Sequence, residues 1–485
     1  MKYFDYIIFS ISILLMISVF ASKLSSKISL PLLITFLGIG MLAGSEGIGK
    51  IYFDDIKFAQ NLGIIALAII LFSGGFFAEH KYIKNILKKG ISLSTIGVLL
   101  TCIITAIFAK ILLKIDIKNA LLIGSILSST DASAVFSILR SKNISLKGDI
   151  KPLLEFESSS NDPIAFILTI ISVSLLTNAQ VDTIDIFLLL IKKIVLGLLI
   201  GFSFGKFLIK ILNSLKLEYY GLYATFSLAS ILFTYYTSEF FDGNGFLAVY
   251  ILGLTISNKN FFWKKFLLDF YESINMLMQI LIFLMLGLLI FPSKLILSWK
   301  SSLILSSILI FISRPIAIFL SLSLSKISVK EKLLISWVGL KGAAPIVLAT
   351  FPVTNNIKGA YDIFNIIFFA VCISCIVQGS SINYLAKILK LTAPYKNKSH
   401  HPIEIEESNN LDANLFECNI DDKNEIVGKA ISELVFPQNT LVLLIFRDQK
   451  YVIVKGNTVI KPNDTLIFLA NQKDFLEIKK TLLII

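Results

Sequence analysis

Apolar runs of about 20 residues recur along most of this chain. A run of that length can cross the hydrocarbon core of a bilayer as an α-helix, which satisfies its own backbone hydrogen-bonding groups in lipid. Over the whole sequence 55% of residues are hydrophobic and 16% are charged, against roughly 25% charged residues in an ordinary soluble domain. The pattern therefore predicts an all-α polytopic membrane protein, with the lipid bilayer as its surroundings.

About thirteen spans are predicted. Their expected bounds are 3–22, 30–48, 58–78, 91–113, 119–139, 153–177, 185–212, 219–237, 243–258, 270–291, 297–324, 333–352 and 361–389. Alternate loops between them carry roughly 19 and about 11 basic residues, and the richer set is expected in the cytoplasm. This places the N-terminus outside and the C-terminus inside. The first span lacks a small-residue cleavage site, so it is predicted to be a retained helix rather than a signal peptide.

Composition argues against several classes of protein. The formal charge of +12 is distributed in twos and threes between apolar runs, which indicates membrane topology and no nucleic-acid partner. Two of the three His residues, His400 and His401, lie in a polar stretch where they are expected to be solvated. Because the chain has no nucleophile motif and no dinucleotide-binding glycine motif, we predict neither an enzyme nor a cofactor, and no metal beyond a transported ion.

The chain changes character after Leu391. A membrane domain is predicted over 1–391 and a polar linker over 392–413. Beyond the linker, short β-type runs and two helix-like segments predict a small α+β domain over 414–485 on the cytoplasmic side. The strands are expected at 414–420, 440–446, 450–454 and 464–470, and the helices at 424–434 and 471–482.

An acid stands in the middle of the fifth predicted span. Asp131 follows Ser128, Ser129 and Thr130 and precedes Ser133. An ionisable side chain is costly at mid-membrane depth and is therefore a functional candidate. Ser and Thr can bond backbone groups that a kink releases, so we expect the helix to be interrupted here, with half-helix ends directed at a site.

The segment LEFESSSNDPIA, at the start of the sixth span, collects oxygen ligands. Ser158 and Asp162 are four residues apart on one helical face, and Glu157 lies beside them. Pro163 cannot donate a hydrogen bond to the carbonyl of Ser159, which is left free. A carboxylate, a hydroxyl and a free carbonyl suit a small monovalent cation better than a transition metal.

Two basic residues also lie within spans. Arg314 must pair, and Glu157 is the preferred partner, with Asp131 second. Lys341 stands between glycines, which predicts a second interrupted helix. An alternative remains open, in which Asp131, Glu157, Arg314 and Lys341 form ion pairs that only fix helix packing. Asp162 is left without a basic partner of its own.

The positions of the two interruptions suggest a repeat. They fall in the fifth and twelfth spans, which is the fifth of each half if spans 1–6 and 8–13 are inverted repeats around a central seventh. Paired interrupted helices at matching positions indicate the binding site of a secondary transporter.

Five ordered motifs carry a family resemblance. They are STDASAVFSILR, LEFESSSNDPIA, SRPIAIFLSLSL, GLKGAAPIVLATFP and FNIIFFAVCISCIVQGSSI. Together they resemble the bacterial cation:proton antiporters of the Na⁺/H⁺ exchanger type, with the potassium/proton branch most similar. The tail is similar to the C-terminal half of the regulator-of-potassium-conductance module, the TrkA-C type.

The resemblance implies roles for individual residues. Asp162 would carry both cation and proton, and its Asn161-Asp162 pair implies electroneutral one-for-one exchange. The other residues implied at the ion site are Asn161, Ser158, Thr130 and Asp131, with Glu157, Arg314 and Lys341 as supporting charges. It also implies a bacterial inner membrane, a role in pH homeostasis, a homodimer, and a small-molecule regulator at the C-terminal domain.

The expected function is exchange of K⁺ for H⁺ by alternating access, with Na⁺ or Li⁺ as alternative cations. A potassium-linked channel is a weaker hypothesis because no TVGYG-like filter is present. A proton-coupled solute symporter is a second weaker hypothesis. The chain departs from the family at Ser73, where relatives often carry an acid, and at Lys341, where Arg is usual. Longer members continue into a further soluble domain, so their regulation is not expected to transfer.

Overall fold

A computed structural model describes residues 2–28, 31–78, 80–142, 144–177, 183–215, 217–259, 261, 263–394, 414–420, 424, 426–437, 439–447, 450–471, 474 and 477–478. The chain forms two compact units, residues 1–397 and 398–485. Each unit is described by itself.

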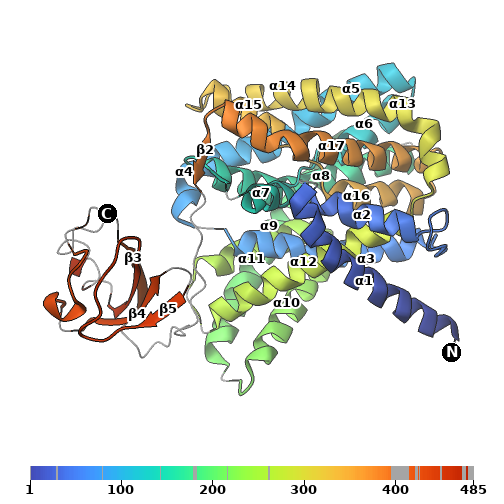
Figure 1. Ribbon diagram of the computed structural model, residues 1–485. Helices are drawn as coiled ribbons and strands as arrows, with labels where there is room; N and C mark the ends of the chain where they lie inside the picture. Colours follow the sequence, from blue (N-terminus) through green and yellow to red (C-terminus); the bar gives the residue numbers. More distant parts are fainter. Residues whose placement is uncertain are drawn as a thin grey trace. The chain divides into compact units, whose positions relative to one another are not determined.

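The first unit is built of helices (Figure 1). They are α1 (Lys2–Ile28), α2 (Leu32–Ala43), α3 (Ile56–Phe76), α4 (His80–Ser92), α5 (Val98–Leu113), α6 (Ile117–Ile126), α7 (Ala132–Ser141), α8 (Ile150–Thr177), α9 (Thr183–Ser214), α10 (Tyr220–Phe240), α11 (Gly245–Ser257), α12 (Lys264–Leu288), α13 (Pro292–Ile308), α14 (Arg314–Ser321), α15 (Val329–Trp337), α16 (Ala343–Thr354) and α17 (Ala360–Ile388). Two π-helical turns, η1 (Leu93–Gly97) and η2 (Leu309–Ser313), join α4 to α5 and α13 to α14. The predicted all-α membrane part is confirmed.

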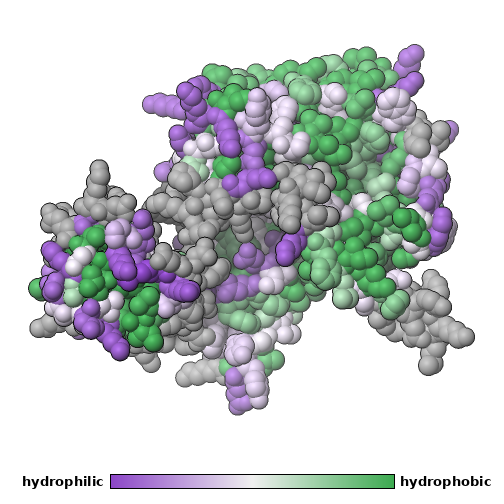
Figure 2. Space-filling model, in the orientation of Figure 1, coloured by the Kyte–Doolittle hydropathy of each residue, from purple (hydrophilic) through white to green (hydrophobic). Residues whose placement is uncertain are grey.

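Seven helical segments are long and apolar enough to cross a bilayer, among them α3, α8, α12 and α17. Shorter apolar helices of 10–17 residues, which include α2, α6, α11 and α16, lie between them. Each of the expected segments overlaps at least one helix, while the total of about thirteen spans stays a prediction. Figure 2 shows hydrophobic side chains over much of the visible surface of this unit. Phe202 and Phe233, 47% and 61% exposed, are suited to contact lipid.

Two of the spans are interrupted, as predicted. The first break runs over Leu127–Asp131, between α6 and α7, and the second over Val338–Gly342, between α15 and α16. Both breaks are buried almost throughout. Non-helical backbone is tolerated at membrane depth only where protein groups satisfy it. Contacts with neighbouring helices must therefore satisfy the backbone groups of both breaks.

A short antiparallel ribbon joins distant parts of the first unit. Strand β1 (Ile144–Leu146), between α7 and α8, pairs with β2 (Thr392–Pro394), directly after α17. The backbone N–H of Lys147 extends the ribbon by donating to the carbonyl of Leu391 over 2.9 Å. The first three residues of the expected linker are thus a strand of the membrane unit, and 395–413 lie outside the described residues.

The second unit contains a four-stranded antiparallel sheet. Its strand order is β3 (Asn414–Asn419), β6 (Thr465–Ala470), β4 (Leu441–Arg447) and β5 (Lys450–Ile453). Cys418, Ile445, Leu466 and Phe468 form part of its buried core. The four predicted strands are confirmed.

The helix predicted over 424–434 is wrong for the described residues. They form a turn at 426–428 and a single 3₁₀ turn, η3 (Ile431–Glu433). Gly428 adopts a φ of 89°, and its N–H donates to the carbonyl of Ile460 over 2.9 Å. Bonds of this kind, to residues distant in the sequence, replace the i→i−4 hydrogen bonds of a helix. Of the helix predicted over 471–482, the described residues include Asn471, which caps by accepting from the N–H of Asp474 over 2.8 Å.

Candidate functional site

Helix α8, which packs against α4 and α6, carries four of the expected site residues within two turns: Glu157, Ser158, Asn161 and Asp162. Glu157 and Asn161 are 1% and 0% exposed, whereas Asp162 is only partly buried. The Asp162 carboxylate accepts a hydrogen bond from the hydroxyl of Ser129, 2.5 Å away in the first break. Asp162 is therefore partly buried and tied to the interrupted helix.

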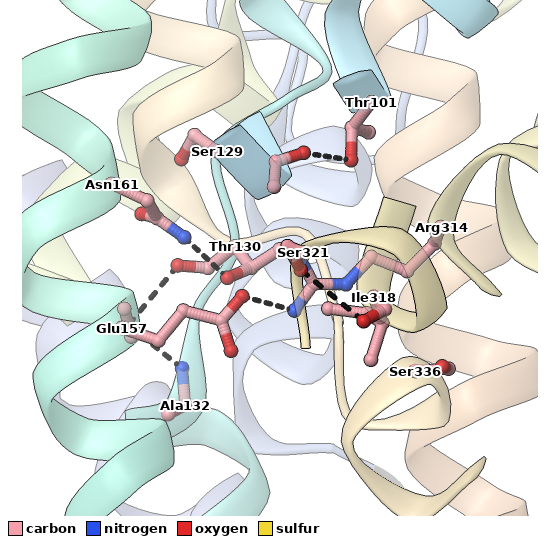
Figure 3. Close-up of polar contacts among 12 residues, drawn as sticks. Thr101, Ser129, Thr130, Ala132, Glu157, Asn161, Arg314, Ile318, Ser321 and Ser336 are labelled. Atoms are coloured by element: carbon pink, nitrogen blue, oxygen red, sulfur yellow. Dashed lines mark hydrogen bonds and ion pairs between the residues drawn. The ribbon is translucent and has the colours of Figure 1, made fainter. Parts of the chain in front are cut away.

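The next contacts of α8 hold the break around Thr130. The Ser158 hydroxyl donates to the carbonyl of Thr130 and accepts from the N–H of Ala132, both over 3.0 Å. The Asn161 amide donates to the hydroxyl of Thr130. Figure 3 shows Asn161 directed at Thr130 from the same helix as Glu157. These bonds satisfy backbone groups that the break between α6 and α7 would otherwise leave unpaired.

Asp131 caps α7 from within the break. One of its carboxylate oxygens accepts from the N–H and the hydroxyl of Ser133, over 2.8 and 2.5 Å, and from the N–H of Ala134 over 3.3 Å. The N–H of Asp131 donates to the carbonyl of Leu340 over 2.7 Å. This bond joins the first break to the second, so the two interrupted helices cross at Asp131 and Leu340. A negative group at the start of a half-helix also suits the helix dipole.

Lys341 reaches from the second break into the first. Its side chain is 1% exposed, and its Nζ donates to the carbonyl of Ser129 over 2.9 Å. Its backbone N–H donates to the hydroxyl of Ser374 over 3.1 Å, and the thiol of Cys375 approaches its carbonyl at 3.1 Å. Helix α17 therefore supports the second break as α8 supports the first.

Arg314 forms a buried ion pair with Glu157 (Figure 3). The side chains are 2% and 1% exposed. The sequence predicts Glu157 in preference to Asp131 as the partner of Arg314, and the observed pair agrees with that prediction. Oε2 of Glu157 and Nε and Nη1 of Arg314 have no hydrogen-bond partner among the described residues. Because isolated buried charges are costly, each member of this pair is held in place by the other.

All eight residues expected at the site lie in this one region, but sequence reasoning missed several of their supports. Ser129 bridges Lys341 and Asp162 through its carbonyl and its hydroxyl. In α17, Gln378 donates to the carbonyl of Trp337 over 2.8 Å. The spacing of Ser374, Gln378 and Ser381 places three polar residues on one face of an apolar helix, a signal that could have identified them.

The group offers oxygen ligands, among them the partly buried carboxylate of Asp162. Among the carboxylates described here, Glu157 pairs with Arg314 and Asp131 caps a helix, while Asp162 is bonded by a hydroxyl. Such a carboxylate can hold a proton or a hard monovalent cation.

Comparisons with known proteins decide the family. The family described as sodium/hydrogen exchanger, transmembrane, matches residues 11–388. The chain belongs to this sodium/hydrogen exchanger family. The TrkA-C domain family matches residues 415–483 of the same exchanger-family chain. The family is that of multi-pass membrane transporters, in agreement with the apolar helices.

Curated relatives of this exchanger-family chain cover nearly all of it. It is 34% identical over 97% of its length to "K(+)/H(+) antiporter NhaP" of Alkalimonas amylolytica, of which 82% is covered. It is 36% identical over 95% of its length to "K(+)/H(+) antiporter NhaP2" of Shewanella sp. (strain ANA-3), of which 80% is covered. The solved sodium proton antiporter MjNhaP1 of Methanocaldococcus jannaschii matches 77% of this chain and 98% of its own, with 24% identity and a TM-score of 0.69. That likeness supports the fold.

Proposed function

We propose that this chain exchanges a monovalent cation for H⁺ across a membrane by alternating access, and that Asp162 carries both ions in turn. The observation that carries the proposal is the position of the Asp162 carboxylate. It is partly accessible, it accepts from Ser129, and it lies where two interrupted helices cross. Relatives similar over nearly the whole chain are named as cation:proton antiporters.

Coupling follows from one carboxylate with two alternative ligands. A protonated Asp162 has lost the charge that attracts a cation, and a bound cation disfavours the proton. If the membrane unit switches its access only when Asp162 is occupied, each cation moved one way is matched by one proton moved the other. Asn161 adds hydrogen bonds without a second charge, which favours electroneutral exchange. Such a cycle is not enzymatic catalysis.

The remaining site residues have supporting roles in this proposal. Ser158 and Thr130 offer oxygen atoms beside Asp162, while Asp131 and Lys341 neutralise the half-helix ends at the crossing. Glu157 and Arg314 hold α8 against η2 and α14 through their buried pair. Ordered water or the transported cation can satisfy the acceptor atoms that lack a protein partner in this region.

K⁺ is the cation that we propose, because the relatives with high coverage are named K⁺/H⁺ antiporters. Na⁺ or Li⁺ remains the alternative of the same mechanism. We also propose a bacterial inner membrane with the N-terminus outside, a homodimer, and a small-molecule regulator bound by the TrkA-C domain. The proposed domain division is 1–391, 392–413 and 414–485, except that β2 (Thr392–Pro394) pairs within the membrane unit.

The test uses purified full-length protein in proteoliposomes with an imposed pH gradient and an internal pH dye. Addition of K⁺, Na⁺, Li⁺ or choline in turn should dissipate the gradient for the transported cation only. Asp162→Asn should abolish the response. Asp185→Asn makes the same change at an exposed carboxylate of α9 and should behave as wild type.

Other outcomes are distinguishable. Cation flux that needs no opposing proton would favour the channel, and proton uptake in the same direction as an organic solute would favour the symporter. Full activity in Asp162→Asn, with competent wild-type vesicles, would reduce Asp162 to a structural role.

A further inference from the structure

A second contact holds α8 at the turn that bears Asp162. The side-chain amide of Asn244 donates to the backbone carbonyl of Pro163 over 2.8 Å. Asn244 is fully buried and lies directly before α11, 81 residues along the chain from its partner. Its own Oδ1 accepts from the N–H of Leu247 over 3.1 Å and so caps α11. A donor on one side and an acceptor on the other fix the orientation of the amide.

The contact falls where α8 is weakest. Pro163 has no N–H, so the helical ladder lacks one bond at the turn formed by residues 159–163. Helices bend at such positions. Asn244 supplies an interhelical bond at the residue after Asp162, and therefore at the point where a bend would displace the carboxylate from Ser129.

The loop that carries Asn244 is itself bonded on every side. The backbone N–H of Asn244 donates to the carbonyl of Lys193 over 3.1 Å, and the N–H of Gly243 donates to the carbonyl of Ser238 over 2.7 Å. The Nζ of Lys193 donates to the carbonyl of Gly243 over 3.2 Å, and Glu239 accepts from the N–H of Gly245 over 2.8 Å. Asn244 is therefore held rigidly by α9 and α10.

The glycines on both sides of Asn244 make the close approach possible. A Cβ atom at Gly243 would lie 2.6 Å from the hydroxyl of Ser238, and one at Gly245 would lie 2.7 Å from the ring of Tyr235. Larger residues would displace the loop and with it the amide. The two glycines of the DGNG segment therefore allow the Asn244 amide to reach Pro163, in addition to allowing the turn.

We propose that Asn244 is a positioning residue for the transported ion, acting through Pro163 to hold the Asp162 carboxylate at the crossing. The inference rests on the proposed function only for the expected effect on cation affinity. The hydrogen bond from Asn244 to Pro163 and its hold on α8 do not depend on transport. A residue that only capped α11 would affect stability. A residue that positions Asp162 also sets the half-saturating cation concentration.

Two substitutions separate these roles. Asn244→Asp keeps the shape and the capping acceptor and loses the donor to Pro163. Asn244→Ser keeps a capping hydroxyl that is too short to reach Pro163 and adds no charge. The control is Asp55→Ala, which removes the N-cap of α3, where Asp55 accepts from the N–H of Phe58 over 2.9 Å. Its effect should be confined to stability.

The first readout is hydrogen exchange of α8 peptides that contain residues 159–167, in the full-length protein. Both Asn244 variants should exchange roughly three- to tenfold faster there than wild type, in keeping with the loss of one hydrogen bond. Asp55→Ala should leave this peptide unchanged. Unaltered exchange in Asn244→Ser overturns the positioning role whether or not the wild type transports.

The second readout is cation-dependent proton movement in proteoliposomes. Both variants should raise the half-saturating K⁺ concentration by roughly three- to tenfold, with a smaller change in maximal rate. An increase in Asn244→Asp alone would be an effect of added charge and would overturn the inference. Wild-type vesicles without exchange would instead reject the proposed function, and the hydrogen-exchange result would still decide the positioning role.

Discussion

The Nζ of Lys341 lies 2.9 Å from the backbone carbonyl oxygen of Ser129, and the hydroxyl of Ser129 in turn donates to Asp162. One serine thus connects a buried cation in the second break to the partly buried carboxylate of Asp162 on α8. The carbonyl that Lys341 binds follows the end of α6, where a cation complements the negative end of the helix dipole.

Lys341→Met should lower the free energy of unfolding by about 1–3 kcal/mol, because the buried carbonyl of Ser129 loses its partner. It should also slow exchange, since Ser129 then holds Asp162 less firmly. Lys341→Arg keeps the charge and should retain exchange. Denaturant titration in mixed micelles and the vesicle assay measure the two effects. A stable, fully active Lys341→Met would show that the bridge is dispensable.

The Glu157 and Arg314 pair should be strongly coupled. Glu157→Leu or Arg314→Met alone should cost about 3–5 kcal/mol of unfolding free energy, since each leaves a buried charge without its partner. The double variant should cost less than the sum, by on the order of 1–3 kcal/mol. A double-mutant cycle in micelles checks this. Additive losses would mean that the two side chains contribute independently.

Protons and cations should compete from the same side of the membrane. As pH falls on that side, the half-saturating K⁺ concentration should rise, approaching about tenfold per pH unit once the carboxylate is mostly protonated. The maximal rate at saturating K⁺ should change less. Rate measurements over a matrix of pH and K⁺ concentrations test this. A pH effect confined to the maximal rate would place the proton on another group.

Glu46 should make the stability of the membrane unit sensitive to acid. Hydrogen bonds from the hydroxyl and the N–H of Ser293 lower the pKa of Glu46 from its ordinary value of 4.5. A group with a lowered folded-state pKa stabilises the protein above its unfolded pKa and loses that effect as pH falls through the folded one. The melting temperature of wild type should therefore exceed that of Glu46→Gln at neutral pH, and the gap should close below about pH 4. A gap that persists in acid would exclude the charge as its cause.

Much of the candidate site was predictable because it violates the rule for membrane helices. Asp131, Asp162, Arg314 and Lys341 are ionisable residues inside apolar runs, and such residues are rarely tolerated without a partner. The pairing of Arg314 with Glu157 follows from the same reasoning.

Asn244 could not be found that way. It stands at the start of a helix within DGNG, where an Asn is an ordinary cap, and its partner Pro163 is distant in sequence. Ser374 carries no charge either, and hydroxyls in membrane helices commonly bond their own backbone, so only its spacing with Gln378 and Ser381 marked it. The helix expected over 424–434 failed because Gly428 and Ile431 donate instead to Ile460 and Thr458, a tertiary preference that local propensity does not contain.

The ribbon of β1 and β2 has a consequence for biosynthesis. Strand β1 is synthesised roughly 250 residues before β2. Its backbone groups have no β2 strand to pair with while helices α8 to α17 are synthesised. The ribbon is therefore one of the last contacts that the membrane unit can form, and it closes only on a chain whose helices have all been synthesised.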